Sequence, residues 1–129
     1  MSDEAFSALS GTCVFLAEDE ALIALEVASL LEETGCEVLG PFARLPEALN
    51  VAATERIDLA VLDVNLKEES VWPVADLLQK RRVPFVFLTG YSKEEEFPAQ
   101  FAHVRRLEKP FVGRHLLAAL ANFVGPATK

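Results

Sequence analysis

Short apolar runs of strand length, separated by segments with helical spacing, constrain this chain most strongly. The segments 12–17 (TCVFLA), 57–62 (IDLAVL) and 85–88 (FVFL) are almost wholly apolar. A strand with one face in water alternates apolar and polar residues, so continuous apolar runs indicate strands that are buried on both faces. Strands of this kind that alternate with helices predict an α/β fold, in which helices cover both sides of a parallel sheet.

Segments with helical spacing lie between and after these runs. We expect helices over 21–34, 46–55, 70–81 and 112–123, and further short strands over 37–39 and 104–107. Gly35 follows the first helix in a position that tolerates left-handed backbone, and Ser70 is a candidate N-cap of the third. Pro98 interrupts the segment between the fourth and fifth strands, so we expect that helix to be short or irregular.

The length of 129 residues, about half of them apolar, suits one domain with a real core. We expect this domain over residues 12–124, with a flexible leader over 1–11 and a short tail over 125–129. The leader lacks the basic start and apolar stretch of a secretory signal. No apolar run approaches the length that crosses a bilayer, so we expect no membrane span and a cytoplasmic protein.

The charge of the chain limits its partners. Twelve basic residues against 20 acidic ones give a formal net charge of −8. Such a surface repels nucleic acid and anionic membranes, so we expect neither as a partner. An acidic balance can also come from carboxylates gathered at a cation site, and composition does not separate these two interpretations.

Cysteine and histidine positions do not predict a zinc site. Cys13 and Cys36 form no CxxC pair, and His103 and His115 lack ligand spacing. We therefore expect two buried free thiols, in keeping with a reducing compartment.

Acidic, hydroxyl and basic side chains follow the predicted strands at their carboxyl ends. They are Glu18, Asp19 and Glu20 after the first strand, Asp63 after the third, Thr89 after the fourth and Lys109 after the fifth. Ligands of open α/β sheets bind beyond these ends, so we expect one shared site. Crowded carboxylates repel one another unless a cation is present, and Mg²⁺ favours oxygen ligands together with phosphate. The sequence therefore predicts a site for Mg²⁺, or for Mn²⁺ in its place.

The residue types suggest a role for each side chain. Asp63 ends a central strand, which makes its carboxylate the expected nucleophile for phosphoryl transfer, giving an aspartyl-phosphate. Glu18 and Asp19 would hold the metal together with Asp63. Thr89 would donate a hydrogen bond to a phosphoryl oxygen, and Lys109 would pair with the phosphoryl charge.

Four short motifs at these strand ends resemble those of response-regulator receiver domains. They read AEDE at 17–20, LDVNL at 62–66, FLTGY at 87–91 and EKPF at 108–111. The resemblance implies a flavodoxin-like, doubly wound (βα)5 fold with a five-stranded parallel sheet. It also implies that Asp63 is the phosphorylated aspartate, that the backbone carbonyl of Asn65 is a further metal ligand, and that a cis peptide bond precedes Pro110.

Some positions depart from the usual receiver pattern. Arg106 stands where most receivers carry a switch Tyr or Phe, and the segment 67–69 (KEE) replaces the usual Pro and Gly in a shortened loop. With the FLTGY motif, these departures resemble the FAT GUY subgroup, whose members are often stand-alone and served by HWE-type histidine kinases. We hypothesise that phosphorylation reorders residues 90–102, and that Asn65 and Tyr91 tune hydrolysis of the acyl phosphate.

The resemblance implies a single-domain response regulator of a two-component phosphorelay. A histidine kinase would phosphorylate Asp63, and the protein would signal by altered binding of a phosphotransfer or output protein, or would act as a phosphate sink. It would catalyse only its own phosphorylation and slow dephosphorylation, and is not an enzyme in the usual sense. The sequence leaves open the cognate kinase, the downstream target, the oligomeric state, the lifetime of the acyl phosphate and whether Arg106 replaces the switch aromatic.

Two other functions are compatible with an α/β fold of this size. A phosphorylation-independent interaction module with the same fold stays open, although the intact set of site residues argues against it. A nucleotide-binding α/β domain fits poorly, because the first strand runs into three carboxylates rather than a glycine-rich turn that cradles phosphate.

Overall fold

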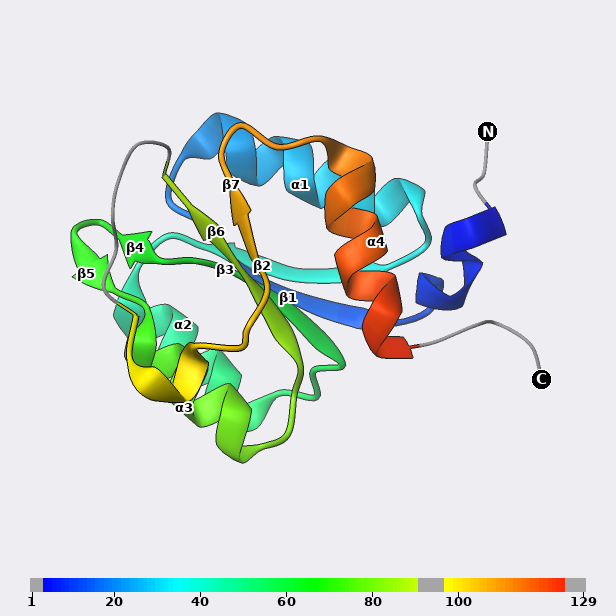
Figure 1. The fold of residues 1–129 in the computed structure, drawn as a ribbon. Helices are drawn as coiled ribbons and strands as arrows, with labels where there is room; N and C mark the ends of the chain where they lie inside the picture. Colours follow the sequence, from blue (N-terminus) through cyan, green and yellow to red (C-terminus); the bar gives the residue numbers. More distant parts are fainter. Residues whose placement is uncertain (1–3, 91–96, 125–129) are drawn as a thin grey trace.

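The computed structural model of the chain describes residues 4–90 and 97–124. A five-stranded parallel sheet forms its centre (Figure 1). In spatial order its strands are β2 (Glu37–Phe42), β1 (Cys13–Ala17), β3 (Leu59–Asp63), β6 (Phe85–Thr89) and β7 (Arg106–Glu108). The helices α1 (Ala21–Glu33) and α4 (Gly113–Val124) cover one face, and α2 (Leu45–Thr54) and α3 (Trp72–Lys80) cover the other. The predicted doubly wound, flavodoxin-like fold is therefore confirmed.

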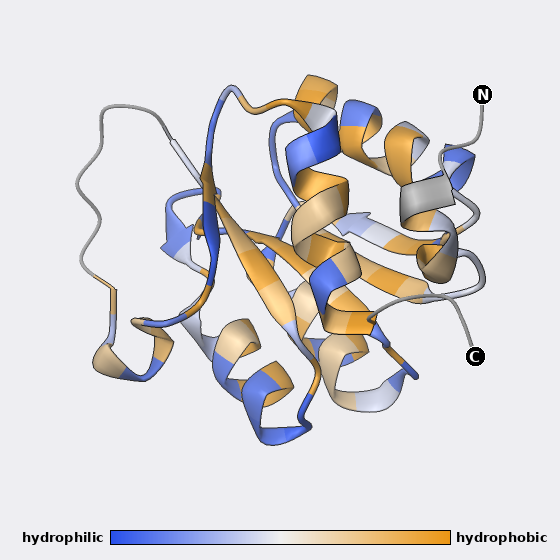
Figure 2. Cartoon of the chain, turned by 45° about the vertical axis from the view of Figure 1, so that its right-hand side comes forward, coloured by the Kyte–Doolittle hydropathy of each residue, from blue (hydrophilic) through white to orange (hydrophobic). Residues whose placement is uncertain are grey.

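The core consists of two layers, one on each side of the sheet. All five residues of β1, β3 and β6 are buried, which is why these strands are continuously apolar in sequence. Figure 2 shows them as the hydrophobic centre of the molecule. One layer packs under α2 and α3 around Phe15 and Phe87, and the other packs under α1 and α4 around Leu16 and Leu116.

The expected short helix between β6 and β7 is a 3-10 turn in the described part of the chain. This turn, η2 (Ala99–Phe101), follows Pro98, whose fixed φ suits the start of a turn and not a helix interior. Phe101 is buried and stacks on Trp72 with ring centroids 5.7 Å apart. Phe97 lies 5.0 Å from Trp72 on the same measure. Trp72, Phe87, Phe97 and Phe101 form what we term the aromatic cluster.

The amino-terminal segment differs from the flexible leader expected over residues 1–11. Residues Glu4–Leu9 form a 3-10 helix, η1. Phe6 is 6% exposed and Leu9 is fully buried, and both belong to the core layer under α1 and α4. Apolar side chains separated by three residues lie on the same side of such a short helix. Burial of these two side chains attaches the segment to the domain.

Several predicted boundaries shift where tertiary contacts decide them. Ser70 does not cap α3: it lies in β5 (Glu69–Ser70), which pairs with β4 (Asn65–Leu66) in a hairpin, and Val71 takes the N-cap position. The strand β2 continues through Gly40 and Pro41 instead of ending there, with a shift in register against β1. Gly40 has a φ of 117°, and a Cβ there would lie 2.5 Å from the Leu16 carbonyl oxygen, so only glycine fits.

The structure also tests what the sequence predicted for the cysteines and for the peptide bond before Pro110. Cys13 and Cys36 are both free and buried, as predicted, and burial raises the pKa of each thiol. The peptide bond between Lys109 and Pro110 is cis, also as predicted. None of the helices within residues 4–90 and 97–124 has the length and apolar character needed to cross a bilayer.

Candidate functional site

The predicted site residues gather at the carboxyl edge of the sheet. Glu18 directly follows β1, Asp63 is the last residue of β3, Thr89 is the last residue of β6 and Lys109 directly follows β7. The strand β3 lies between β1 and β6 in the sheet, so Asp63 occupies the centre of this edge. The order of the strands also reverses between β1 and β3, which is the place where open α/β sheets form their ligand crevice.

Lys109 is the centre of a network of charged side chains. Its Nζ lies 3.2 Å from Asp63 Oδ2, 2.8 Å from Glu20 Oε1 and 3.1 Å from Glu18 Oε1. The Lys109 and Asp63 side chains are only 9% and 8% exposed, and that of Glu18 is fully buried. Water screens such buried charges much less than surface ion pairs, so this network dominates the electrostatics of the site.

Burial raises the pKa of Asp63 to about 8, and the adjacent Glu18 carboxyl group adds to the rise by hydrogen bonding and charge. Lys109 and the backbone N–H of Asn65, which donates to Asp63 Oδ1 over 3.2 Å, act in the opposite direction without cancelling it. Burial alone would lower the pKa of Lys109, but the hydrogen bond that Lys109 donates to Glu20 and the charges of Asp63 and Glu18 raise it. Lys109 therefore stays charged.

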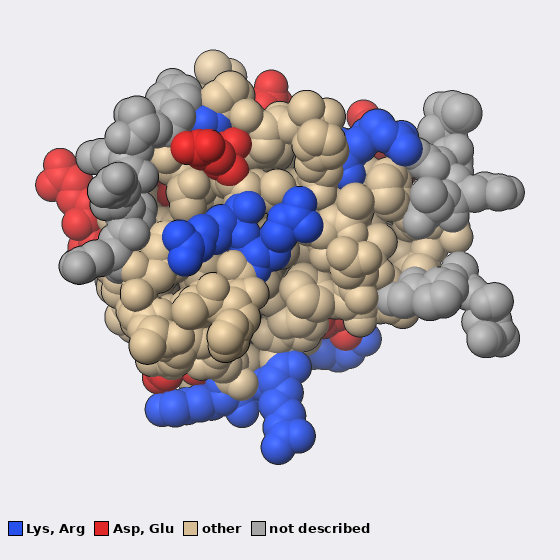
Figure 3. All heavy atoms as spheres, in the orientation of Figure 1, with Lys and Arg blue, Asp and Glu red and all other residues tan. Residues whose placement is uncertain are grey.

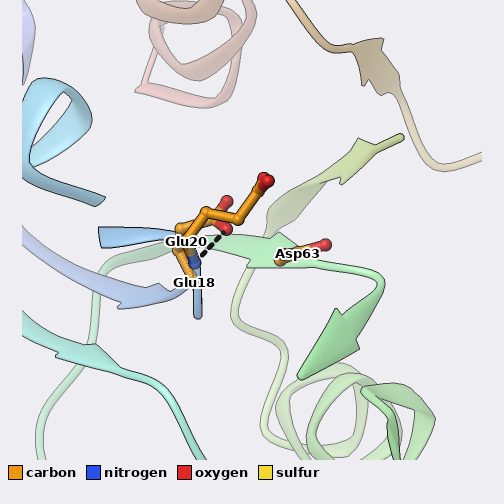
Figure 4. Close-up of side chains that lie close together, drawn as sticks. All are labelled: Glu18, Glu20 and Asp63. Carbon is orange, nitrogen blue, oxygen red and sulfur yellow. Dashed lines mark hydrogen bonds between the residues drawn. The ribbon is translucent and has the colours of Figure 1, made fainter. Parts of the chain in front are cut away.

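The carboxylates of the site fit a hard divalent cation. Glu18, Glu20 and Asp63 each offer an oxygen within 4.8 Å of the others, and Figure 4 shows their side chains side by side at the ends of β1 and β3. Glu18 Oε1 is buried and has no hydrogen-bond partner, although Lys109 Nζ is within ion-pairing distance. One lysine faces three carboxylates, so negative charge is in excess. An orphaned buried oxygen and excess negative charge suit an oxygen-ligated cation.

Asp19 lies apart from this group of three carboxylates. Its Oδ2 accepts a hydrogen bond of 2.8 Å from the backbone N–H of Lys67, the first turn residue of the β4–β5 hairpin. Lys67 and Glu68 both have positive φ, 50° and 71°, in a two-residue turn that normally selects Asn and Gly. The assignment of Asp19 as a metal ligand stays a prediction, and the structure adds that this carboxylate holds the turn beside the site.

The hydroxyl and amide positions flank Asp63. Thr89 is buried at 9% exposure, and its backbone carbonyl accepts a 2.9 Å hydrogen bond from the Lys109 N–H. This bond fixes the lysine beside the end of β6. The role of the Asn65 carbonyl as a ligand stays a prediction, and Tyr91 lies outside the described residues.

Sequence reasoning missed the role of Glu20. Its Oε1 makes the shortest contact to Lys109, and its backbone N–H donates to Glu18 Oε2 over 3.0 Å (Figure 4). The third consecutive acidic residue after β1 was a signal in the sequence. The sequence could not predict where the Glu20 side chain points, because that depends on how the chain turns into α1.

Comparisons with known proteins agree with this geometry. The family model of the response regulator receiver domain matches residues 14–121. The chain is 32% identical over 110 residues to the transcriptional regulatory protein PdtaR of Mycobacterium tuberculosis, which covers 83% of this chain and 54% of that protein. It is 33% identical over 104 residues to the phyllosphere-induced regulator PhyR of Methylorubrum extorquens, which covers 78% of this chain and 37% of that protein. The chain thus spans about half, or less, of these curated relatives.

Solved structures show the same fold. The solution structure of SdrG from Sphingomonas melonis Fr1 superimposes with a TM-score of 0.77 at 35% identity, covering 92% of this chain and 98% of that one. The receiver domain of the sensor histidine kinase PA1611 from Pseudomonas aeruginosa, with magnesium coordinated in its active-site cleft, gives a TM-score of 0.77 at 23% identity, covering 90% and 99%. Receiver domains are phosphoacceptor switches of two-component systems that bind Mg²⁺ at an acidic site. By its matching family model and its assembled site, this chain belongs to the response regulator receiver domains.

Proposed function

We propose that Asp63 accepts a phosphoryl group from the phosphohistidine of a histidine kinase, with the help of a divalent cation. The observation that carries this proposal is the buried contact of Lys109 Nζ with Asp63 and Glu18. A buried ion pair often stabilises a fold no better than apolar packing would, and buried groups with shifted pKa values cluster at functional sites. Transfer of a phosphoryl group to Asp63 would use the Asp63 carboxylate as acceptor and the Lys109 ammonium group as the neighbouring positive charge.

In the proposed step, the phosphoryl group passes directly from the phosphohistidine to Asp63. A bond forms between a carboxylate oxygen of Asp63 and phosphorus while the P–N bond of the phosphohistidine breaks, and the imidazole nitrogen leaves with the electron pair of that bond. Lys109 neutralises charge on the phosphoryl oxygens, and the Thr89 hydroxyl donates a hydrogen bond to one of them. Asp63 must be ionised to attack, so its raised pKa makes a nearby cation important.

Mg²⁺, or Mn²⁺ in its place, would be held by Glu18 and Asp63, with Asp19 and the Asn65 carbonyl completing the set and Glu20 as a competing ligand. When bound, it would neutralise negative charge on the carboxylates and the phosphoryl oxygens. The buried Glu18 oxygen that accepts no hydrogen bond and the three adjacent carboxylates support this role.

Phosphorylation would act on the segment between β6 and β7. We hypothesise that phosphorylation reorders residues 90–102. Of these, Gly90 and 97–102 are described by the structure, and 91–96 lie outside the described residues. Arg106, at the position of the usual switch aromatic, places its guanidinium 3.6 Å from the centroid of the Phe97 ring. A cation–π contact therefore links β7 to this segment and offers a route by which a change at Thr89 could alter its packing.

The proposed partners rest on the resemblance to the FAT GUY subgroup and on the similarity to PhyR proteins. The sequence resemblance to FAT GUY receivers supports an HWE-type histidine kinase as phosphodonor and a cytoplasmic location. A PhyR structure from Bartonella quintana is described as an anti-anti-sigma factor, and it shares 26% identity with this chain. An output or phosphotransfer protein is accordingly the proposed partner of the phosphorylated form, with a phosphate sink as the other mode of action.

The competing function is an interaction module that signals without phosphate. Incubation with acetyl phosphate and Mg²⁺, followed by intact mass, separates the two. We expect a gain of one phosphoryl group, lost in Asp63→Asn and retained in Asp76→Asn, whose carboxylate lies on α3 and pairs with Lys80. A wild-type chain that gains no phosphoryl group while binding Mg²⁺ would favour the interaction module.

A further inference from the structure

A groove opens at the opposite end of the sheet from Asp63. It has a volume of about 750 Å³ and lies between the end of α3, the turn η2 and the last turns of α4. Its lining includes Phe85, the first residue of β6, and Arg105, which precedes β7. These are the amino-terminal ends of strands whose carboxyl ends form the phosphoacceptor site. The groove is therefore a separate feature of the molecule.

The described part of the connection from β6 to β7 contributes little helical structure at this end of the sheet. A crossover between parallel strands usually supplies a helix that packs over the sheet. In the described part of this connection, only the three residues of η2 form helical structure. Its Gln100 side chain donates to Gln79 Oε1 on α3 over 2.9 Å, which closes one rim of the groove.

The floor and the rim of the groove differ in chemistry. Phe85, Val104 and Ala119 supply an apolar floor, and Phe123 on the α4 side is 43% exposed. Arg82, His103 and Arg105 line the rim, and none of the described residues that line the groove carries a carboxylate. Within residues 4–90 and 97–124, Arg82 and Arg105 form no ion pair. Figure 3 shows basic side chains over β7 and at the lower end of the molecule, with a largely uncharged surface between them.

This charge distribution is opposite to that of the whole chain. The protein carries a net charge of −8, so two arginines that have no ion-pair partner among the described residues and stand beside an apolar floor mark a local site of anion preference. Enclosed sites for small molecules bury most of the ligand surface, roughly 70–90% of it. Here the rim residues Arg82, His103 and Arg105 are exposed and the groove is open to solvent, which suits a length of polypeptide better.

Arg82 adds an independent observation. It follows the C-cap of α3 with a φ of 65°, a conformation in which glycine or asparagine is usual. An arginine at this position is less favourable for the backbone than glycine. Backbone strain of this kind clusters at ligand-binding sites, and here it lies at an arginine on the rim of the groove.

We propose that this groove binds an acidic segment of a partner protein. An apolar side chain of the segment would cover Phe85 and Val104, and its carboxylates would pair with Arg82 and Arg105. The proposal goes beyond phosphorylation, because none of these residues belongs to the Asp63 site, and it would give the receiver a second surface for a partner.

The test is a titration of the isotope-labelled full chain, followed by NMR, with an acetylated ten-residue probe peptide of glutamates around two leucines. We expect saturable shifts of the Phe85, Val104 and Ala119 amides. A peptide with lysines in place of the glutamates should give none. Absence of saturable shifts, or equal shifts with both peptides, would overturn the proposal.

Variants separate a binding role from a structural one. The double variant R82E/R105E should weaken probe binding about tenfold or more, since attraction becomes repulsion at two positions. The control R44E/R56E makes the same charge change on exposed arginines outside the groove and should leave binding unchanged. Arg82→Gly should weaken binding while the melting temperature stays the same or rises. A fall in both would mean that Arg82 is merely structural.

Two other occupants of the groove, a small anion and a second copy of this chain, would give different experimental results. Shifts of the same amides with glutarate alone, at the same concentrations as the probe, would assign the groove to small anions and overturn the polypeptide assignment. A dimer in sedimentation experiments that R82E/R105E abolishes would assign it to a second copy of this chain, which would overturn it equally.

Discussion

The protonation of Asp63 depends on the groups around its carboxyl group. Burial and Glu18 raise its pKa to about 8, from an ordinary value of 3.8. A raised pKa favours the protonated form of Asp63 when no cation is bound. Asp63 must attack as an anion, so a bound cation that lowers its pKa would favour the reactive form.

The first prediction concerns stability against pH in the absence of metal. Because the pKa of Asp63 is higher in the folded state, its contribution to stability is fully present below about pH 4 and is lost as the pH rises through about 8. We expect Asp63→Asn to reduce this decline, measured by urea unfolding in EDTA between pH 5 and pH 9, roughly the window of the shift. Equal declines in both proteins would locate the effect elsewhere.

The second prediction distinguishes Asp19 from Glu20, the two candidate metal ligands that follow Glu18. We expect Asp19→Asn to weaken Mg²⁺ binding about tenfold or more, because the Lys67 N–H already orients this carboxylate. Glu20→Gln should have a smaller effect, since the Glu20 side chain is 59% exposed and paired with Lys109. Calorimetric titration with Mg²⁺ measures both. A larger loss in Glu20→Gln would assign the metal to Glu18, Glu20 and Asp63.

At the scale of elements, β7 is linked to the segment that precedes η2 through one side chain. Arg106 leaves the edge strand of the sheet and covers the Phe97 ring, which itself packs on Trp72 of α3. The aromatic cluster thus joins α3, β6 and η2 beneath an arginine. In place of a switch aromatic, this receiver has a cation on β7 and the aromatic ring on the neighbouring segment.

The third prediction tests this contact. Arg106→Gln should lower the free energy of unfolding by about 0.5–1 kcal/mol, the usual size of an exposed cation–π contact. It should also change the emission of Trp72, the single tryptophan, which lies 5.0 Å from Phe97. Arg105→Gln, one residue away, is the matched control and should change neither. Identical behaviour of the two variants would remove Arg106 from the coupling route.

At the scale of the whole molecule, two core layers meet at a single sheet, and the amino-terminal turn completes one of them. Phe6 and Leu9 of η1 pack into the layer under α1 and α4. The Arg114 guanidinium on α4 lies 5.3 Å from the centroid of the Phe6 ring. The segment before β1 therefore belongs to the folding unit, and its removal would open the core.

The fourth prediction follows from this packing. Phe6→Ala should destabilise the fold by about 3 kcal/mol, since it removes a buried aromatic side chain and leaves a cavity. Ser7→Ala, at an exposed neighbouring position, should change stability by less than about 0.5 kcal/mol. Urea unfolding measures both. Equal and small effects would mean that η1 is loosely attached in solution, as its sequence suggested.

Sequence patterns were enough to predict the sheet and the edge at which the site lies. Strands buried on both faces must be continuously apolar, as β1, β3 and β6 are, and the carboxyl ends of parallel strands share one edge. From these two facts Glu18, Asp63, Thr89 and Lys109 could be brought together without coordinates. The proline before η2 likewise marked the irregular connection.

Tertiary structure alone decided the contacts that depend on distant parts of the chain. Lys109 and Glu18 are 91 positions apart, and whether Glu20 also reaches the lysine depends on the entry of the chain into α1. The turn that binds Asp19 has no Asn-Gly signature, and the docking of η1 needs a partner surface made by α4. Periodicity reports which face of an element is buried, but the neighbour that buries it is fixed only when the elements pack.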